Sequence, residues 1–233
     1  VLGQHRIPPL NTLAQLFHEV SGKIFRSLPE FDHYPNRGPA EFLGLPPDPP
    51  RPLTAWPAGE GPKVFAYLKP YKFLENLLTE IQQRKLVTII ACDGIPQEMQ
   101  NKFKCDTMKF VPPTVDIYQM GREASFAITN ANLTTSVRLL LQGCPVMTVP
   151  LQLEQTLVGA NLQDLGVGLM SRNTVVDDLA PHLTEMTQQS KFRDAAKALA
   201  EKYKNHPNDY VDRAVEVMER FLPQATAQPT PAT

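Results

Sequence analysis

The sequence predicts an α/β protein built on a parallel sheet. From about residue 61 to residue 170, short apolar runs alternate with amphipathic stretches, and Gly or Pro closes most runs. The apolar runs have the length of buried strands, and each strand and helix together take roughly 20 residues. Such a repeat connects parallel strands by right-handed crossovers. We therefore predict a doubly wound sheet, with ligands bound beyond the carboxyl ends of its strands.

The predicted strands and helices follow one another along the chain. The strands are expected at 63–68, 86–91, 108–111, 126–129, 144–150 and 167–170. The helices are expected at 71–85, 96–103, 115–120, 133–142 and 154–165, and from 176 onward in pieces that include 190–203 and 209–222, the last capped by Asn208. Gly143 and Gly166 stand where glycine ends a helix in the left-handed conformation. Residues 61–223 are thus expected to form one domain.

The first 60 residues have a different composition. Residues 1–62 hold 12 of the 23 prolines, and such a run forms neither helix nor ladder, so we expect it to lie extended over a surface. Before the proline cluster, apolar residues recur at helical spacing and predict an amphipathic helix from Asn11 to Leu28, capped by Asn11. Residues 1–60 are therefore read as an N-terminal helix and a Pro-rich arm. Residues 224–233 are expected to be disordered.

Composition excludes several classes of protein. The 233 residues are 42% hydrophobic and 20% charged, which indicates a globular chain. A net charge of −1, with scattered lysines and arginines, gives no indication of nucleic-acid binding. No apolar run reaches the length of a membrane span. The three cysteines are odd in number and lack metal-ligand spacing, so we expect reduced thiols and a cytoplasmic location.

A short motif lies in the centre of the predicted sheet. Gly143-Cys144-Pro145 is followed five residues later by Pro150 and, after three more residues, by Glu154-Gln155. This spacing resembles the donor-binding half of two-domain glycosyltransferases of the GT-B type, in the branch of the macrolide and UDP-glucuronosyl transferases. Residues 165–168 fit the next part of that family's pattern. The alternative is an ordinary doubly wound domain in which Gly and Pro only separate the elements.

The resemblance implies a Rossmann-like fold and a function. The substrate would be a nucleotide sugar such as a UDP- or dTDP-hexose, from which a hexosyl group passes to a small acceptor without a cofactor or metal. Residues 28–35 and 54–59 resemble the end of the first domain and the interdomain linker in that family. The acceptor-binding domain would then be missing, and the chain alone would be inactive and prone to self-association through its exposed apolar face. The last helix would cross onto that first domain, or else pack on its own sheet.

The resemblance also assigns site residues. The loop before the predicted helix at 133 would bind the diphosphate through Asn130 and through the backbone or hydroxyl groups of Asn132, Leu133, Thr134 and Thr135. Amides at a helix N-terminus suit an anion, although Asn132 and Thr134 are equally typical of helix caps. Glu154 and Gln155 would bind the sugar hydroxyls, with a favourable place in a helix dipole as the alternative for Glu154. Val111 and Pro112 would lie against the base. Lys69 could approach a phosphate, with a solvated surface lysine as its alternative.

Two departures from the family pattern fall in the same region. The family has His-Gly-Gly where this chain has Asn130-Ala131-Asn132, and the family's ribose-binding glutamate falls on Arg138. An arginine cannot accept the hydrogen bonds that a glutamate accepts, although it could bind a phosphate. The five histidines lie outside the two loops expected to bind the donor, residues 130–135 and 151–155, so no catalytic residue is assigned. A second hypothesis is therefore a degenerate glycosyltransferase-like domain with an interaction or regulatory role. A sugar-nucleotide epimerase is a third.

Overall fold

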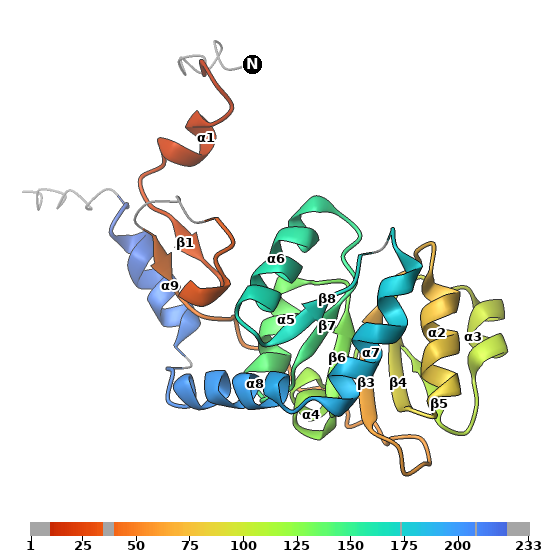
Figure 1. Ribbon diagram of the computed structural model, residues 1–233. Helices are drawn as coiled ribbons and strands as arrows, with labels where there is room; N and C mark the ends of the chain where they lie inside the picture. The colour runs from red at the N-terminus through yellow and green to blue at the C-terminus, as the bar shows by residue number, and fades with distance from the viewer. Residues whose placement is uncertain (1–9, 35–39, 173, 208, 223–233) are drawn as a thin grey trace, which may run out of the picture. The chain divides into compact units, whose positions relative to one another are not determined.

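The predicted parallel sheet is present in the computed structural model, which describes residues 10–34, 40–172, 174–207 and 209–222 (Figure 1). Six parallel strands lie in the order β5-β4-β3-β6-β7-β8. Their bounds are β3 Lys63–Leu68, β4 Val87–Cys92, β5 Met108–Val111, β6 Phe126–Thr129, β7 Val146–Thr148 and β8 Gly168–Met170. The fold class predicted from the sequence, an α/β doubly wound Rossmann-like sheet, is confirmed.

The strand order reverses direction at one place. From β3 the chain proceeds outward through β4 to β5, and it then returns to pair β6 with the other side of β3. From β6 it proceeds outward again through β7 to β8. In sheets of this kind, the crevice between the two strands at the reversal is where ligands bind. Lys69 follows β3 and Asn130 follows β6, so both residues lie at this switch point.

Helices connect the strands, with ends that differ by a few residues from those predicted. Their bounds are α2 Leu74–Gln83, α3 Gln97–Phe103, α4 Ile117–Glu123, α5 Leu133–Leu140, α6 Leu153–Asp164, η3 Val176–Asp178, α7 Leu179–Gln188 and α8 Lys191–Lys202. Gly143 has a φ of 75° and Gly166 a φ of 70°, so both end their helices in the left-handed conformation that the sequence predicted. The Gly143 N–H donates to the carbonyl of Leu140, and the Cys144 N–H donates to that of Leu139.

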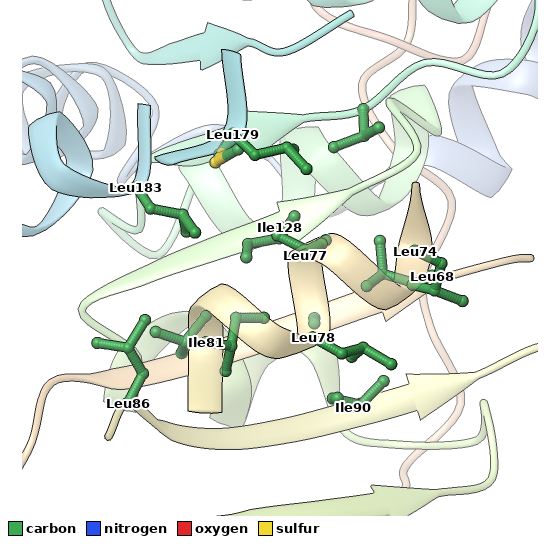
Figure 2. Close-up of a cluster of buried hydrophobic side chains, with 14 of the residues drawn as sticks. Leu68, Leu74, Leu77, Leu78, Ile81, Leu86, Ile90, Ile128, Leu179 and Leu183 are labelled. Atoms are coloured by element: carbon green, nitrogen blue, oxygen red, sulfur yellow. The ribbon is translucent and has the colours of Figure 1, made fainter. Parts of the chain in front are cut away.

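One face of the sheet is covered by α2 and α7, as Figure 2 shows. Leu77 and Ile81 of α2 and Leu183 of α7 are completely buried in this core. Alternate residues of β3 face the same cluster, because successive strand residues point to opposite sides of a sheet. Each buried Leu, Ile or Val side chain of this cluster stabilises the fold by about 1.5–3 kcal/mol.

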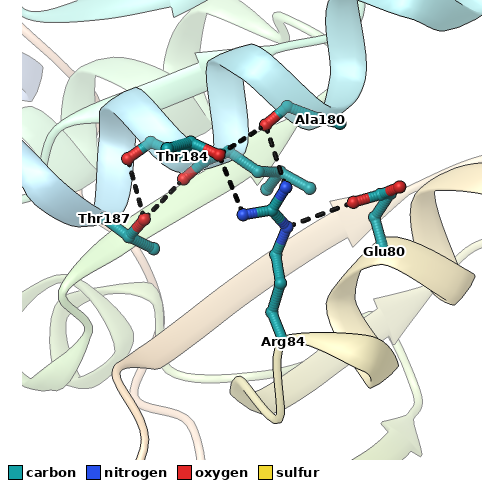
Figure 3. A network of polar contacts seen from close by, with 6 residues as sticks. Glu80, Arg84, Ala180, Thr184 and Thr187 are labelled. Carbon is teal, nitrogen blue, oxygen red and sulfur yellow. Dashed lines mark hydrogen bonds and ion pairs between the residues drawn. The ribbon is translucent and has the colours of Figure 1, made fainter.

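A polar network also fastens α7 to α2 (Figure 3). The Arg84 guanidinium donates to the hydroxyl of Thr184 over 2.9 Å and to the carbonyl of Ala180 over 3.1 Å. Its Nε donates to Glu80, one turn earlier. Arg84 therefore holds α7, which follows β8 in the chain, against α2.

The Pro-rich arm runs extended along α4 and α5. Gln119 binds both the amide and the carbonyl of Thr54, and the Trp56 indole donates to Glu123 over 2.6 Å. Asp48 forms an ion pair with Arg138 of α5. Residues 47–60 carry no helix or strand, as expected of this composition. Side chains of the domain thus satisfy the backbone groups of an arm that has no ladder of its own.

The described chain divides into two compact units. The larger contains residues 30–33 and 47–207, and the smaller contains the other described residues. This division differs from the predicted boundary at residue 60, because the arm is bound to α4 and α5. The prediction of an arm at 1–60 and a domain at 61–223 remains a proposal about domain organisation. Asn208 and residues 224–233 lie outside the described residues.

In the smaller unit, the prediction of a helix from Asn11 to Leu28 is wrong. Only α1, Gln15–His18, is helical, and the chain then forms β1, Ile24–Phe25. This strand pairs in parallel with β2, Glu41–Phe42, so a long-range pairing overrides the helical spacing of the apolar residues. The Gln15 side chain also accepts hydrogen bonds from the amides of Asn11 and Thr12. The chain reaches the larger unit through η2, Pro29–Phe31.

Helix α9, Tyr210–Glu219, belongs to the smaller unit. Arg213 donates to the carbonyl of Phe42, and Arg220 pairs with Glu41 over 2.7 Å. Val217 is buried, whereas the apolar stripe that includes Val211 and Met218 is exposed. The helix is therefore grouped with the N-terminal segment rather than with the sheet.

The cysteines form no disulfide. Cys92 and Cys105 are half-buried, and Cys144, which follows the Gly143 turn, is completely buried. Burial raises the pKa of the Cys144 thiol to about 12, against a smaller opposing effect of the Arg193 charge. Among the described residues, no helix is both long enough and apolar enough to cross a membrane.

Candidate functional site

The candidate site lies at the carboxyl edge of the sheet, where the loops after β3, β6 and β7 meet (Figure 1). Apart from Arg138, the residues assigned from the sequence to the donor come from three loops at this edge. Val111 and Pro112 end and follow β5, residues 130–135 follow β6, and Glu154 and Gln155 follow β7. Since all six strands are parallel, the fold brings these loops to the same edge.

Asn130 joins three neighbouring strand ends. Its side-chain oxygen accepts a hydrogen bond from the amide of Lys69 over 2.7 Å, and its side-chain nitrogen donates to the carbonyl of Val149 over 2.9 Å. Asn130 is buried, with 4% of its surface exposed. The amide side chain thus connects the end of β6 to those of β3 and β7. Its polar atoms are engaged within the protein, where the resemblance had assigned them to a diphosphate.

Ala131 and Asn132 set the start of α5. Ala131 has a φ of 58°, a left-handed conformation that is strained for any residue with a Cβ, and its amide donates to the hydroxyl of Thr129 over 3.1 Å. The Asn132 side chain accepts from the amide of Thr135 over 3.3 Å and so caps the helix. The capping role considered for Asn132 is therefore present.

Three backbone donors remain at this helix start. In the described part of the chain, the amides of Asn132, Leu133 and Thr134 have no protein acceptor. Such amides at the positive end of a helix dipole bind anions. The hydroxyls of Thr134 and Thr135 belong to half-buried residues of the same turn. This part of the predicted diphosphate loop is available to a ligand, unlike Asn130.

The loop after β7 is arranged differently. The Gln155 side-chain oxygen accepts from the amide of Leu151 over 2.8 Å, which closes the loop before α6 and leaves the side-chain NH₂ as a donor. Glu154 is exposed in the first turn of α6, and no described residue forms a hydrogen bond or ion pair with its carboxylate. The two side chains assigned to the sugar therefore offer an acceptor and a donor at one helix start.

Arg138, assigned to the ribose, lies in the last turn of α5 and pairs with Asp48 of the arm over 3.2 Å. The two side chains are only 12% and 16% exposed. Val111 and Pro112 lie at the end of β5, two strands from β3, and the carbonyl of Val111 accepts a hydrogen bond from the thiol of Cys92. The structure thus places Arg138 against the arm. Val111 and Pro112, assigned to the nucleotide base, lie two strands from β3.

Sequence reasoning missed the contacts around Lys69. Its ammonium group pairs with Asp93, the residue after β4, over 3.1 Å, and its amide is bound by Asn130. Part of the signal was present, because Lys69 and Asn130 directly follow the strands predicted at 63–68 and 126–129. What the sequence lacked was the strand order that makes β3 the neighbour of both β4 and β6.

Solved structures with this fold are known, although no protein-family model matches the sequence. A search of curated protein sequences found no match either. The glycotransferase of kitacinnamycin superposes with a TM-score of 0.74 and 14% identity, over 95% of this chain and 60% of that enzyme. The calicheamicin glycosyltransferase CalG4 gives 0.69 and 14%, over 95% and 60% of the two chains. The glycosyltransferase VinC, solved in complex with dTDP, gives 0.65 and 19%, over 80% and 50%.

These matches define the fold of the chain. It is the Rossmann-like half of the GT-B fold, as seen in glycosyltransferases such as the calicheamicin and kitacinnamycin enzymes. The chain spans 60% or less of the length of the structures named above. At identities below 20% the likeness concerns the fold.

Proposed function

We propose that this chain is the donor-binding part of a glycosyltransferase and holds a nucleotide sugar, such as a UDP- or dTDP-hexose, at the carboxyl edge of its sheet. One observation carries the proposal. The backbone amides of Asn132, Leu133 and Thr134 have no acceptor among the described residues, and they lie beside the switch point between β3 and β6. A diphosphate is the part of such a ligand that a helix start binds best.

The order of the assigned residues along the sheet supports the same ligand. Val111 and Pro112 lie at β5, the unpaired amides at β6, and Glu154 with Gln155 at β7. Strands in a sheet are about 4.8 Å apart, so these positions form an elongated row several strands wide. Base, diphosphate and sugar follow one another in a nucleotide sugar in that same order. The exposed Glu154 carboxylate and the free NH₂ of Gln155 suit a group with several hydroxyls.

The reaction proposed for the whole enzyme is transfer of the hexosyl group to a small acceptor. The leaving diphosphate gains charge in that step, and the helix-start amides stabilise it. No described residue of the two loops is a histidine, so the proposal takes the catalytic base from an acceptor-binding domain. We assign this domain to the part of the matched structures that the chain does not span, since the chain covers 60% of the kitacinnamycin enzyme. We therefore propose that the chain alone binds the donor but does not turn it over.

The direct test is a calorimetric titration of the 233-residue chain with UDP, dTDP and their glucose conjugates. We expect saturable binding of one nucleotide series and a raised melting temperature, because a ligand of the native state stabilises it. Glu154→Ala should weaken the sugar conjugate about tenfold and the free diphosphate little, since one hydrogen bond to a charged group is worth about 1.5–3 kcal/mol. Absence of binding to all four compounds would refute donor binding.

A second candidate function has its own supporting observation. Asn130 and Arg138, the two departures from the family pattern, are both engaged in contacts within the protein. A domain that had lost donor binding and served as an interaction or regulatory module would show such contacts. The titration distinguishes the two candidates, because this second function predicts no affinity for any nucleotide sugar.

The proposal extends to partners and location. The exposed apolar side chains of the smaller unit, among them Leu13, Phe17 and Met218, support a partner surface, either the acceptor-binding domain or a second copy of the chain. Sedimentation of the isolated chain at high concentration tests self-association. Three unpaired thiols support a reducing compartment such as the cytoplasm.

A further inference from the structure

Lys69 is the cation at the switch point of the sheet. Among the described residues, the one or two positions that follow each strand of the six-stranded sheet contain two basic side chains, Lys69 after β3 and Arg172 after β8. Arg172 lies at the outer end of the sheet and is paired with Asp178. Lys69 lies instead on the strand adjacent to β6, whose loop starts α5. The position of Lys69 is thus the one from which a cation reaches the donor crevice.

The backbone of Lys69 is fixed to the diphosphate loop. Its amide donates to Asn130 over 2.7 Å, so the Cα of Lys69 stays next to the loop that ends with the unpaired amides. Asn130 is itself held by Val149, which leaves the anchor little freedom. The side chain, in contrast, is 55% exposed and carries its charge on a flexible four-carbon stem. Because the backbone of Lys69 is fixed and its side chain is flexible, the ammonium group can change its partner.

The present partner of the ammonium group is exchangeable. Lys69 Nζ and Asp93 Oδ2 are 3.1 Å apart, and the Asp93 side chain is 45% exposed. Exposed ion pairs of this kind contribute less than about 1 kcal/mol, since water competes for both charges. A diphosphate carries more negative charge than one carboxylate and would be held at the same time by the helix-start amides. It would therefore displace Asp93 from Lys69.

We propose that Lys69 is a donor-binding residue: its ammonium group binds the diphosphate of the nucleotide sugar, and Asp93 holds that group while the site is empty. This inference rests on the proposed function and adds a residue to its site. It supplies the positive charge at a loop where the resembling family has a histidine and this chain has Asn130, whose side chain is engaged with the backbone. Lys69 acts by binding and orienting the leaving group and takes no part in proton transfer.

The test measures the affinity of the full 233-residue chain for dTDP and UDP with and without the ammonium group. Lys69→Gln should weaken the diphosphate that binds about tenfold, the typical effect of one charge-assisted hydrogen bond. Lys69→Arg should keep the affinity within about threefold, because the positive charge is retained. The affinity of the wild type should also decrease more with added salt than that of Lys69→Gln, because a charge pair is screened.

Lys102→Gln is the matched control. Lys102 forms an ion pair with Glu75 over 2.9 Å, and the two side chains are 59% and 53% exposed, so the pair resembles that of Lys69 but joins helices α2 and α3 rather than the ends of two strands. This variant should bind the diphosphates like the wild type. Equal melting temperatures of the two variants without ligand show that both are folded. Asp93→Asn should strengthen binding a few-fold by releasing Lys69.

The outcomes separate this inference from the proposed function. If the wild type binds a diphosphate and Lys69→Gln binds it equally well, Lys69 is not a donor-binding residue, while the proposed function stands. An equal loss in Lys102→Gln would also overturn the inference, since it would reflect general surface charge. Unchanged or weaker binding by Asp93→Asn would refute the role given to Asp93. If the wild type binds neither diphosphate and neither glucose conjugate, the proposed function itself is refuted, and this inference with it.

Discussion

The loops after β6 and β7 stand side by side at the same edge of the sheet, and their polar side chains are used in opposite ways. Asn130 of the first loop is buried and has both ends of its amide bound to backbone groups. Glu154 of the second loop is exposed and has no described protein partner. Asn130 departs from the pattern of the GT-B glycosyltransferases, whereas Glu154 matches it.

The same contrast extends to Arg138 and Gln155. Arg138 departs from the pattern and is largely buried against Asp48, whereas Gln155 matches it and keeps its NH₂ group free. At the two departures from the pattern the side chains are bound within the protein, and at the two matches the Glu154 carboxylate and the Gln155 NH₂ group remain open to a ligand. Measurements of stability in single variants test this division.

The largest effect is expected for Asn130→Ala. The substitution leaves the buried Val149 carbonyl and the partly buried Lys69 amide without their partner, and an unsatisfied buried group costs about 1–3 kcal/mol. We expect a loss of about 3 kcal/mol in the free energy of unfolding, measured with urea. Asn132→Ala, which removes a helix cap, is the control and should cost about 1 kcal/mol. A loss no greater than that of the control would contradict the role of Asn130.

The second effect concerns Arg138→Glu, which introduces the residue of the glycosyltransferase pattern. It places two carboxylates together at a largely buried position, where the protein now has an ion pair with Asp48. We expect a loss of about 2 kcal/mol, less than for a fully buried pair that loses one partner. Asp48→Asn in the same chain should recover part of this loss, as a double-mutant cycle in urea would show. Additive effects of the two changes would count against the pairing.

The third effect concerns Glu30, whose contact with Lys202 and Tyr203 is partly exposed. Burial tends to raise the pKa of Glu30, but hydrogen bonds from Lys202 and Tyr203 outweigh it and hold the pKa below its usual value. A lowered folded-state pKa contributes stability above the unfolded pKa of about 4.3, and this contribution disappears as pH falls through the folded pKa.

We therefore expect Glu30→Gln to cost less than about 1 kcal/mol at pH 7, because the contact is partly solvated. The difference from the wild type should be constant above about pH 5 and vanish at lower pH. Urea unfolding of both proteins between about pH 3 and pH 7 measures it. A difference that grows as the pH falls would show that the sign of the pKa shift is wrong.

The smallest effect on stability is expected for Glu154→Ala. Its carboxylate has no described partner and lies on the surface, so the free energy of unfolding should change by less than about 0.5 kcal/mol. The same variant is expected to lose affinity for the sugar conjugate. A large loss of stability would mean that Glu154, like Asn130, supports the structure, and the contrast between the loops would fail.

Local patterns sufficed to predict the sheet from the sequence. The strands at 63–68, 108–111 and 126–129 have the predicted bounds, because a buried parallel strand is a short apolar run with clear ends. Gly143 and Gly166 likewise take the predicted conformation. The helix predicted at 11–28 was wrong for the opposite reason. The pairing of Ile24 with Glu41 depends on residues far apart in sequence, which helical spacing does not report.

The candidate site was less accessible to such reasoning. A motif assigns a residue to a ligand without indicating what else its side chain binds. Asn130 and Arg138 show this limitation, because their partners Lys69, Val149 and Asp48 are 19 to 90 positions away along the chain. Lys69 was visible as a lysine after a strand, but its nearness to the β6 loop required the strand order. Long-range hydrogen bonds and ion pairs thus decide which polar residues remain available.

Because Cys144 is buried, the rate at which its thiol is labelled measures local opening of the protein core. A thiol reagent acts on the thiolate, and Cys144 is both inaccessible and raised in pKa to about 12 in the native protein. Cys92 and Cys105 are partly exposed and would be modified first. Slow labelling of the third thiol then reports how often the core behind the Gly143 turn opens under native conditions. Mass spectrometry of labelled protein would thus rank variants of the β6 loop without any denaturant.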